Sequence, residues 1–540
     1  MFDFLIRDAL IIDGTGAPGY RGDLAVSEGR IAAVSDKLNG EAKRMIDAQG
    51  HIVCPGFIDA HGHSDFTLFI NHRGESKIRQ GITTEVTGNC GFTAGPFSDD
   101  HKEDLDYYLA NTILLTEEQR ASWNWKTHDE FLRYSARDGL SFNLAPLVGH
   151  GMIHVAVMGF EDRMPTVAEL DRMKSMLKTE LDAGLFGLSM AFQYEPGNYV
   201  SIEEVLELCA VVQSYERIYS IHMRNESSQL LECVRHAIEI AERSGCRVEV
   251  SHLKASNRAN WGKAREAMAL IAAARDRGVD IAFDVYPYIA GGSGLIDLMP
   301  PWVKKDGPKA MCELLADDSV RERVLADMRT GLPGWDSMLS NVDWDDRVQI
   351  ATLLTEGNQR YQGMTIKEIA KERGTTSYEA VVNLIIEEAA FVKCIFFMMD
   401  EDELIDIMKH PLAVFGTDGR ACATYGELSK GAIHPRYYGT YPRIMGHYVR
   451  DRGIMPIEEA ILKSTSAVAR RFRIDERGEI KEGYFADLVM FSYDEIAETN
   501  TFERPHSYPK GIDLVMVNGE IVVEGGEHTD ALPGLILRKE

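Results

Sequence analysis

The chain has 540 residues, of which 45% are hydrophobic and 26% are charged. These are the proportions of a folded globular protein, and the length fits a large domain with a smaller one, or one barrel with an accessory layer. The formal net charge of −26 argues against nucleic acid and against an anionic membrane as partners, because both require a basic surface. An anionic substrate would need a locally basic pocket.

The cysteines and the apolar segments indicate the compartment. Eight cysteines are scattered along the chain without a CxxC pair, so we do not expect structural disulfides. The apolar N-terminal stretch contains Asp3, Arg7 and Asp8, unlike a signal peptide or an anchor. No apolar run reaches the length of a membrane span. We therefore expect a cytoplasmic protein, and nothing indicates its oligomeric state.

Both chain ends consist of short apolar runs separated by turns. Residues 2–53 have breaks at 14–16 and at Glu28-Gly29, and residues 486–528 have Asn518-Gly519 between two apolar runs. Because the middle of the chain has a different pattern of predicted elements, we expect residues 1–55 and 475–540 to pair as one small β-sandwich domain.

Between the two ends, predicted strands alternate with helices. The candidate strands are Ile52–Ile58, Thr83–Thr87, Phe142–Leu147, Leu185–Met190, Ile218–Ile221, Arg247–Ser251, Ile281–Val285 and Leu412–Phe415. This alternation predicts an α/β fold, a (β/α)8 TIM-like barrel over residues 56–474. Residues 291–411 are too long for one crossover, so we expect an inserted subdomain, or lid, before the last barrel strand.

Metal-ligating side chains follow several of these strands. They are His61, His63, Cys90, His222, His252 and Asp418. Because barrel enzymes carry their chemistry at the carboxyl ends of the strands, we expect these side chains to meet and to form a metal site. The remaining histidines that we considered lie off this face and are interpreted as structural: His150, His154, His236, His410 and His447.

Several segments resemble one family closely. They are GFIDAHGHSD, TTEVTGNCG, HMRNES, VSHLKAS, FDVYPYIAG, GTDG, HPRYYGTYPR and ADLVMFSYDEI. In these segments the chain resembles the amidohydrolase superfamily and, within it, the N-acyl-D-amino-acid deacylases, almost from end to end. The resemblance implies a zinc ion held tightly by Cys90, His222 and His252. It also implies a neighbouring, weaker site at His61 and His63, with Asp418 as general base and a contact of the second metal.

One departure from the wider superfamily concerns the fourth strand. Dihydroorotase-like and urease-like members carry a carboxylated lysine at its end, whereas this chain reads GLSMAF there. The resemblance implies that the thiolate of Cys90 takes the place of that lysine.

Three further residues fit a pocket for the substrate. The amino acid released from an N-acyl amino acid keeps its α-carboxylate, which a cation and hydrogen-bond donors would hold. By resemblance, Lys254, Tyr286 and Arg436 match the carboxylate-binding residues of the family.

The resulting prediction is zinc-dependent hydrolysis of the amide bond of small-molecule N-acyl-D-amino acids. The D preference comes wholly from the resemblance. One alternative is a hydrolase of cyclic amides, similar to dihydroorotase or hydantoinase, against which the missing lysine counts. Others are a non-catalytic scaffold of the same fold and a nucleobase aminohydrolase. The latter would need an HxxE-type acid, where this chain has HMRNE and HLKAS.

Overall fold

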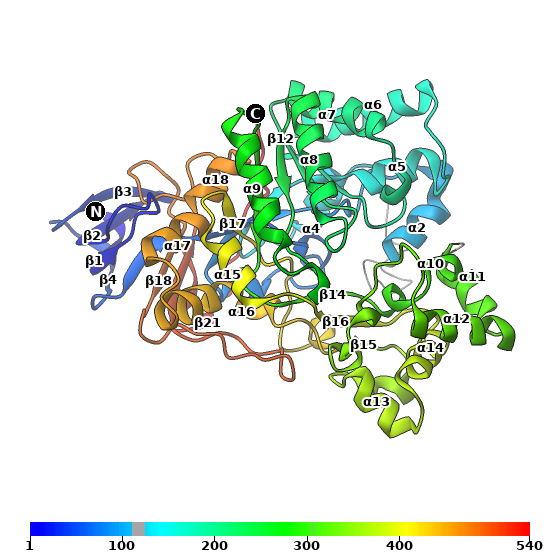
Figure 1. Ribbon diagram of the computed structural model, residues 1–540. Coiled ribbons are helices and arrows are strands. Elements are labelled where there is room, and N and C mark those ends of the chain that lie inside the picture. The colour runs from blue at the N-terminus through cyan, green and yellow to red at the C-terminus, as the bar shows by residue number, and fades with distance from the viewer. Residues whose placement is uncertain (111–124, 306) are drawn as a thin grey trace.

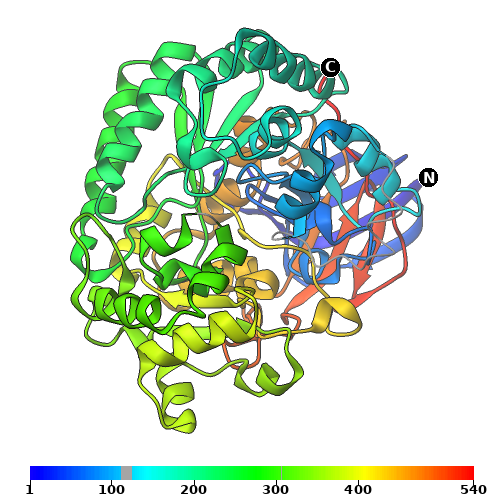
Figure 2. The same cartoon turned by 90° about the vertical axis from the view of Figure 1, so that its right-hand side faces the viewer.

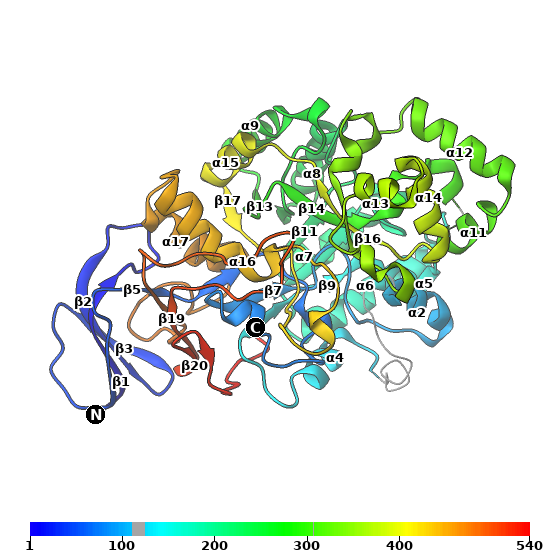
Figure 3. The same ribbon diagram turned by 90° about the horizontal axis from the view of Figure 1, so that it is seen from below.

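The structure is a computed structural model that describes residues 1–110, 125–305 and 307–540 (Figure 1). A barrel lies at the centre of the molecule. A β sheet built from both chain ends lies on one side of it, and a largely helical insertion lies on the other (Figures 1 and 3). No helix among the described residues is long and apolar enough to cross a membrane.

The barrel consists of parallel strands, and the expected TIM-type fold is confirmed. Within the described chain its strands are β6 (Phe57–Asp59), β7 (Ile82–Thr87), β8 (Asn143–Pro146), β9 (Val148–Gly149), β10 (Gly187–Ala191), β11 (Ile218–His222), β12 (Arg247–Val250), β13 (Ile281–Val285) and β17 (Ala413–Phe415). The third strand is interrupted at Leu147, so that β8 pairs with β7 and β9 with β10. The ring closes where the Ala60 amide donates to the Phe415 carbonyl at 3.1 Å.

Helices cover the outside of the barrel (Figure 2). The principal ones are α5 (His150–Met158), α6 (Val167–Asp182), α7 (Ile202–Ser214), α8 (Leu230–Ser244), α9 (Lys263–Asp276), α15 (Glu401–Lys409) and α17 (Ile457–Ser464). In α8 the buried positions include Leu230, Cys233, Val234 and Ala237, spaced three to four residues apart. This apolar stripe faces the sheet and the polar positions face outward.

The predicted strand Ile52–Ile58 is wrong as a single element. It is two strands that belong to different sheets, β5 (Ile52–Pro55) in the terminal sheet and β6 in the barrel. Gly56 lies between them, and a Cβ there would come within 2.1 Å of Thr83 Oγ1. A glycine is therefore required where the chain passes tightly from one sheet to the other.

An extra β domain is present as expected, and the described strands of both chain ends form one nine-stranded sheet in it. Its members besides β5 are β1 (Phe2–Ile11), β2 (Tyr20–Ser27), β3 (Arg30–Ser35), β4 (Ala42–Asp47), β18 (Leu488–Phe491), β19 (Ile512–Val517), β20 (Glu520–Glu524) and β21 (Glu527–His528). The two ends join where β18 pairs antiparallel with β5. The last residues leave this sheet and run along β8, where the Leu144 amide donates to the Leu535 carbonyl at 2.8 Å.

The insertion folds around its own core. Its antiparallel strands β14 (Ala290–Gly294), β16 (Lys393–Phe397) and β15 (Val348–Thr352) pair in that order. Its longer helices are α11 (Gly307–Leu314), α12 (Asp318–Thr330), α13 (Ile366–Arg373) and α14 (Ser377–Glu387). Buried side chains such as Val324, Ile350 and Ile385 form a cluster separate from the barrel core.

Candidate metal centre

The structure brings all six predicted ligands together at the mouth of the barrel. His61 and His63 follow β6, Cys90 follows β7, His222 ends β11, His252 follows β12, and Asp418 follows β17. These strands are spread over residues 57–415, but their carboxyl ends meet at one side of the closed sheet.

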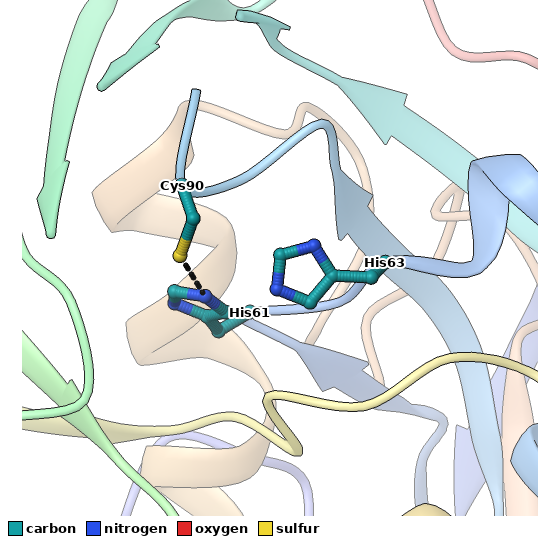
Figure 4. Close-up of side chains that lie close together, drawn as sticks. All are labelled: His61, His63 and Cys90. Atoms are coloured by element: carbon teal, nitrogen blue, oxygen red, sulfur yellow. Dashed lines mark hydrogen bonds between the residues drawn. The ribbon is translucent and has the colours of Figure 1, made fainter. Parts of the chain in front are cut away.

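The thiol of Cys90 lies at the centre of the group. Its Sγ is 3.3 Å from Nε2 of His61, 3.7 Å from Nδ1 of His222 and 3.8 Å from Nε2 of His252. Figure 4 shows Cys90 and His61 pointing toward each other, with the ring of His63 beside them. Both His61–His63–Cys90 and Cys90–His222–His252 have donor atoms within 4.8 Å of one another. Two neighbouring ligand sets therefore share one sulfur atom.

Asp418 lies on the His61 and His63 side of this group. Its Oδ1 is 3.3 Å from Nε2 of His63 and 3.7 Å from Nε2 of His61. Its backbone amide donates to the carbonyl of His61 at 2.8 Å, across the closing seam of the barrel. The side chain of Asp418 is 15% exposed, so one carboxylate reaches both the ligands and the open mouth.

Sequence reasoning missed the residues that orient the imidazoles. Nδ1 of His61 contacts Asp284 at 3.1 Å, Nε2 of His222 contacts Gln193 at 2.8 Å, and Nδ1 of His252 contacts Glu226 at 3.0 Å. In each ring the other nitrogen is the one that faces Cys90. This is the arrangement by which a metal-ligating histidine is held through its second nitrogen. Asp284 and Glu226 do stand inside the FDVYPY and HMRNES segments, but their spacing gave no separate signal.

Three of the predicted ligands have an unusual backbone. Cys90, His252 and Asp418 have φ angles of 55°, 36° and 45°, in the left-handed region that residues with a side chain rarely adopt. Such conformations cluster at functional sites, where the surrounding structure holds them. Here the sharp turn after each strand aims the side chain back into the mouth.

The electrostatics favour the ligand form of the thiol. Burial opposes ionisation of Cys90, but His61, His222 and His252 outweigh it and hold the pKa of Cys90 well below its ordinary value. Burial likewise opposes ionisation of Asp418, yet the Arg436 guanidinium and the imidazoles hold its pKa well below the usual value for a carboxyl. A thiolate and a carboxylate therefore face the imidazoles, and a metal ion could take the place of the ring protons at these nitrogens.

A buried network of ion pairs and hydrogen bonds lies next to the predicted ligands. Lys77 is fully buried, and its Nζ lies 2.7 Å from Asp59, 3.1 Å from Glu85 and 2.6 Å from Thr417. It also donates to the carbonyl of Gly419 at 2.9 Å. Lys77 thus ties the end of β6 to the turn that carries Asp418.

The three predicted clamp residues lie beside the centre. Arg436 contacts Asp418 at 2.7 Å, and its guanidinium carbon lies 4.7 Å from the centroid of the Tyr286 ring. Lys254 Nζ is 5.8 Å from the same centroid and is paired with Glu226 at 2.7 Å. The hydroxyl of Tyr286 is buried and has no hydrogen-bond partner in the described part of the chain. The ring of Tyr286 therefore lies near two cations, and its hydroxyl is a buried donor without a partner among the described residues.

The donor set suits a zinc-type ion, because imidazole, thiolate and carboxylate are its usual protein ligands. The orienting partners of three rings, described above, fit a bound ion at Cys90. Ligands of this kind at the carboxyl mouth of a TIM-type barrel, supported by oriented histidines, define a metal-dependent hydrolase of the amidohydrolase class.

Comparisons with known proteins identify the family. The model of the Amidohydrolase family matches residues 363–523. The chain is 32% identical to D-aminoacylase of Alcaligenes xylosoxydans xylosoxydans, over 100% of this chain and 98% of that protein. It is also 32% identical to N-acyl-D-aspartate deacylase of the same organism, over 99% and 95% of the two chains. The protein therefore belongs to the D-aminoacylase and N-acyl-D-amino-acid deacylase family of amidohydrolases, and the resemblance found in the sequence is confirmed.

A solved structure agrees. The fold matches that of N-acyl-D-glutamate deacylase from Bordetella bronchiseptica, complexed with zinc and a phosphonate mimic of the tetrahedral intermediate. The TM-score is 0.81 at 32% identity, over 99% of each chain. L-hydantoinase from Arthrobacter aurescens matches with a TM-score of 0.56 at 18% identity and shares the fold alone.

Proposed function

We propose that the protein hydrolyses the amide bond of N-acyl-D-amino acids, giving a carboxylic acid and a free D-amino acid. Family membership supports the reaction and the D configuration. The observation that carries the proposal is the position of Lys254, Tyr286 and Arg436 directly beside the Cys90 cluster. This geometry presents an α-carboxylate clamp next to the place where the amide would react.

We propose that zinc occupies the centre. Cys90, His222 and His252 would hold it tightly, and His61 and His63, with Cys90 and Asp418, would form the neighbouring weaker site. A bound zinc ion polarises a carbonyl and lowers the pKa of water toward neutrality.

Asp418 would carry the proton in this reaction. Its ionised carboxylate accepts a proton from the attacking water, and the carbon–nitrogen bond then breaks as the same proton passes to the leaving amine. His63 and Arg436 hold the carboxylate from two sides, at 3.3 and 2.7 Å. Its position between the ligands and the mouth lets one group reach both water and amine.

We propose that residues 291–411 act as a lid over this site. A Cβ at Gly291 would lie 3.3 Å from the Tyr286 hydroxyl, and one at Gly292 would lie 3.9 Å from Arg436. The carbonyl of Met398 accepts from the Asn257 amide at 2.9 Å, near the turn after β12. Both ends of the insertion therefore contact the barrel mouth, where closure would exclude water. A cytoplasmic location remains a prediction from the cysteine pattern.

The test is amine release from paired N-acetyl-D- and N-acetyl-L-amino acids by zinc-loaded protein, beside Cys90→Ala and Asp418→Ala. Activity on the D series alone, lost in both variants, would support the proposal. If neither series is cleaved while zinc is fully bound, the clamp is wrong and cyclic amides become the next substrates. Absence of bound zinc in the folded protein would favour a non-catalytic scaffold instead.

A further inference from the structure

The insertion begins with a glycine-rich strand beside the clamp residues. This strand, β14, reads AGGSG and lies at the edge of its sheet, where it pairs with β16 on one side. Gly291 is buried, whereas the next residue, Gly292, is exposed. Arg436, which lies close to Gly292, is only 5% exposed. The backbone at Gly292 therefore borders a space that is open on one side and has a clamp residue on the other.

Packing explains a glycine at position 291 but not at position 292. A Cβ at Gly291 would lie 2.5 Å from Met398 Cε, which is too close for two carbon atoms. Apart from its chain neighbours, a Cβ at Gly292 would have only Arg436 Nη2 and the carbonyl of Cys394 within 4 Å among the described residues. Both lie at 3.9 Å, an ordinary van der Waals distance.

The backbone does not require glycine at 292 either. Its φ angle lies outside the positive region, so a residue with a side chain could adopt this conformation without strain. A glycine inside a strand costs conformational entropy and has no side chain to pack. Such a glycine often marks a place where a ligand approaches the backbone closely.

We propose that Gly292 determines the substrate specificity of the site. Its missing side chain leaves room for the side chain of the D-amino acid that is released, so the enzyme accepts D-amino acids with long side chains. This inference rests on the proposed function and adds a substrate class to it.

The position of Gly292 relative to Asp418 selects this part of the substrate. Arg436 contacts Asp418 at 2.7 Å through Nη1, and its Nη2 lies toward Gly292. In an N-acyl amino acid, one carbon carries both the carboxylate that the clamp would hold and the nitrogen that Asp418 would protonate. The side chain leaves from this same carbon, so it lies beside Arg436, where Gly292 leaves space. The acyl group lies beyond the reacting carbonyl carbon, away from the clamp.

The test compares kcat/KM for N-acetyl-D-methionine, N-acetyl-D-glutamate and N-acetyl-D-alanine in the wild type, Gly292→Ala and Gly292→Val. One methylene group more or less in a pocket changes kcat/KM by about 10- to 200-fold. We expect the ratio of kcat/KM for the long side chains to that for alanine to fall by about 10-fold in Gly292→Ala. It should fall further in Gly292→Val. The control Gly357→Ala, whose Cβ would have nothing within 4 Å, should keep the wild-type ratio.

An unchanged ratio in both Gly292 variants would overturn the proposal and leave the proposed hydrolase function untouched. An equal loss on all three substrates would also overturn it, because Gly292 would then act on the clamp and not on the side chain. If the variants do not fold, the wild type decides: cleavage of either long substrate supports the proposal, and cleavage of the alanine substrate alone refutes it. A wild type that cleaves none of the three refutes the proposed function, and this inference with it.

Discussion

Replacement of Asp418 by asparagine tests the proposed proton transfer with little change in shape. In the wild type the carboxylate is held by His63 and Arg436, at 3.3 and 2.7 Å, and these neighbours keep its pKa well below the ordinary value. It is therefore ionised throughout the neutral range and ready to accept a proton. An amide can keep one of these contacts but is not a base.

We expect kcat of Asp418→Asn to fall by about 10³-fold, the middle of the range for a positioned acid–base group. This corresponds to about 4 kcal/mol of activation free energy. The assay is the steady-state release of D-amino acid, with zinc content measured on the same sample. KM should change much less, because the carboxylate clamp remains.

The matched control is Asp280→Asn. Asp280 precedes β13 at the opposite end of the barrel and pairs with Arg471 at 2.6 Å, so kcat should be unchanged. The proton-transfer role is refuted if Asp418→Asn, with the zinc content of the wild type, keeps kcat within about tenfold of it, below the contribution of such a group.

Three further predictions concern the clamp, the packing of the ligands and a buried histidine. Lys254→Met should raise KM for N-acetyl-D-amino acids by about 10- to 100-fold, because a hydrogen bond to a charged group contributes about 1.5–3 kcal/mol. An equal rise in KM for the N-acetyl amine that lacks the carboxylate would contradict the clamp. Gly62→Ala should abolish zinc binding at the weaker site of His61 and His63 and lower the free energy of unfolding by about 1–3 kcal/mol, because its Cβ would lie 2.0 Å from Glu85 Oε1. The free energy of unfolding is measured by urea titration. The control Gly357→Ala, whose Cβ would have nothing within 4 Å, should leave it unchanged. Normal zinc binding by Gly62→Ala would show that the packing at Gly62 is not tight. Burial lowers the pKa of His128 to about 3, so the unfolded state binds the proton first as the pH falls from 6.5 to 3, and the wild type loses stability there. In His128→Leu, the free energy of unfolding should fall less steeply with pH, by up to about 1.4 kcal/mol per pH unit. Parallel curves of unfolding free energy against pH for the wild type and the variant would disprove this role of His128.

The fold class and the ligands were predictable from local sequence. Strand and helix periodicities are set by neighbouring residues, and the carboxyl ends of barrel strands converge whatever the details of packing. His61, His63, Cys90, His222, His252 and Asp418 could therefore be placed at one mouth before their distances were known.

Tertiary structure decided the rest, because contacts between distant segments leave no local signal. The division of the chain at Gly56 depends on Thr83, and the partners of the imidazoles, Asp284 and Glu226, come from other strands and loops. His150 and His154 have helical spacing that is typical of many core histidines. Only the approach of Glu204 from α7 joins this pair into a buried hydrogen-bonded triad.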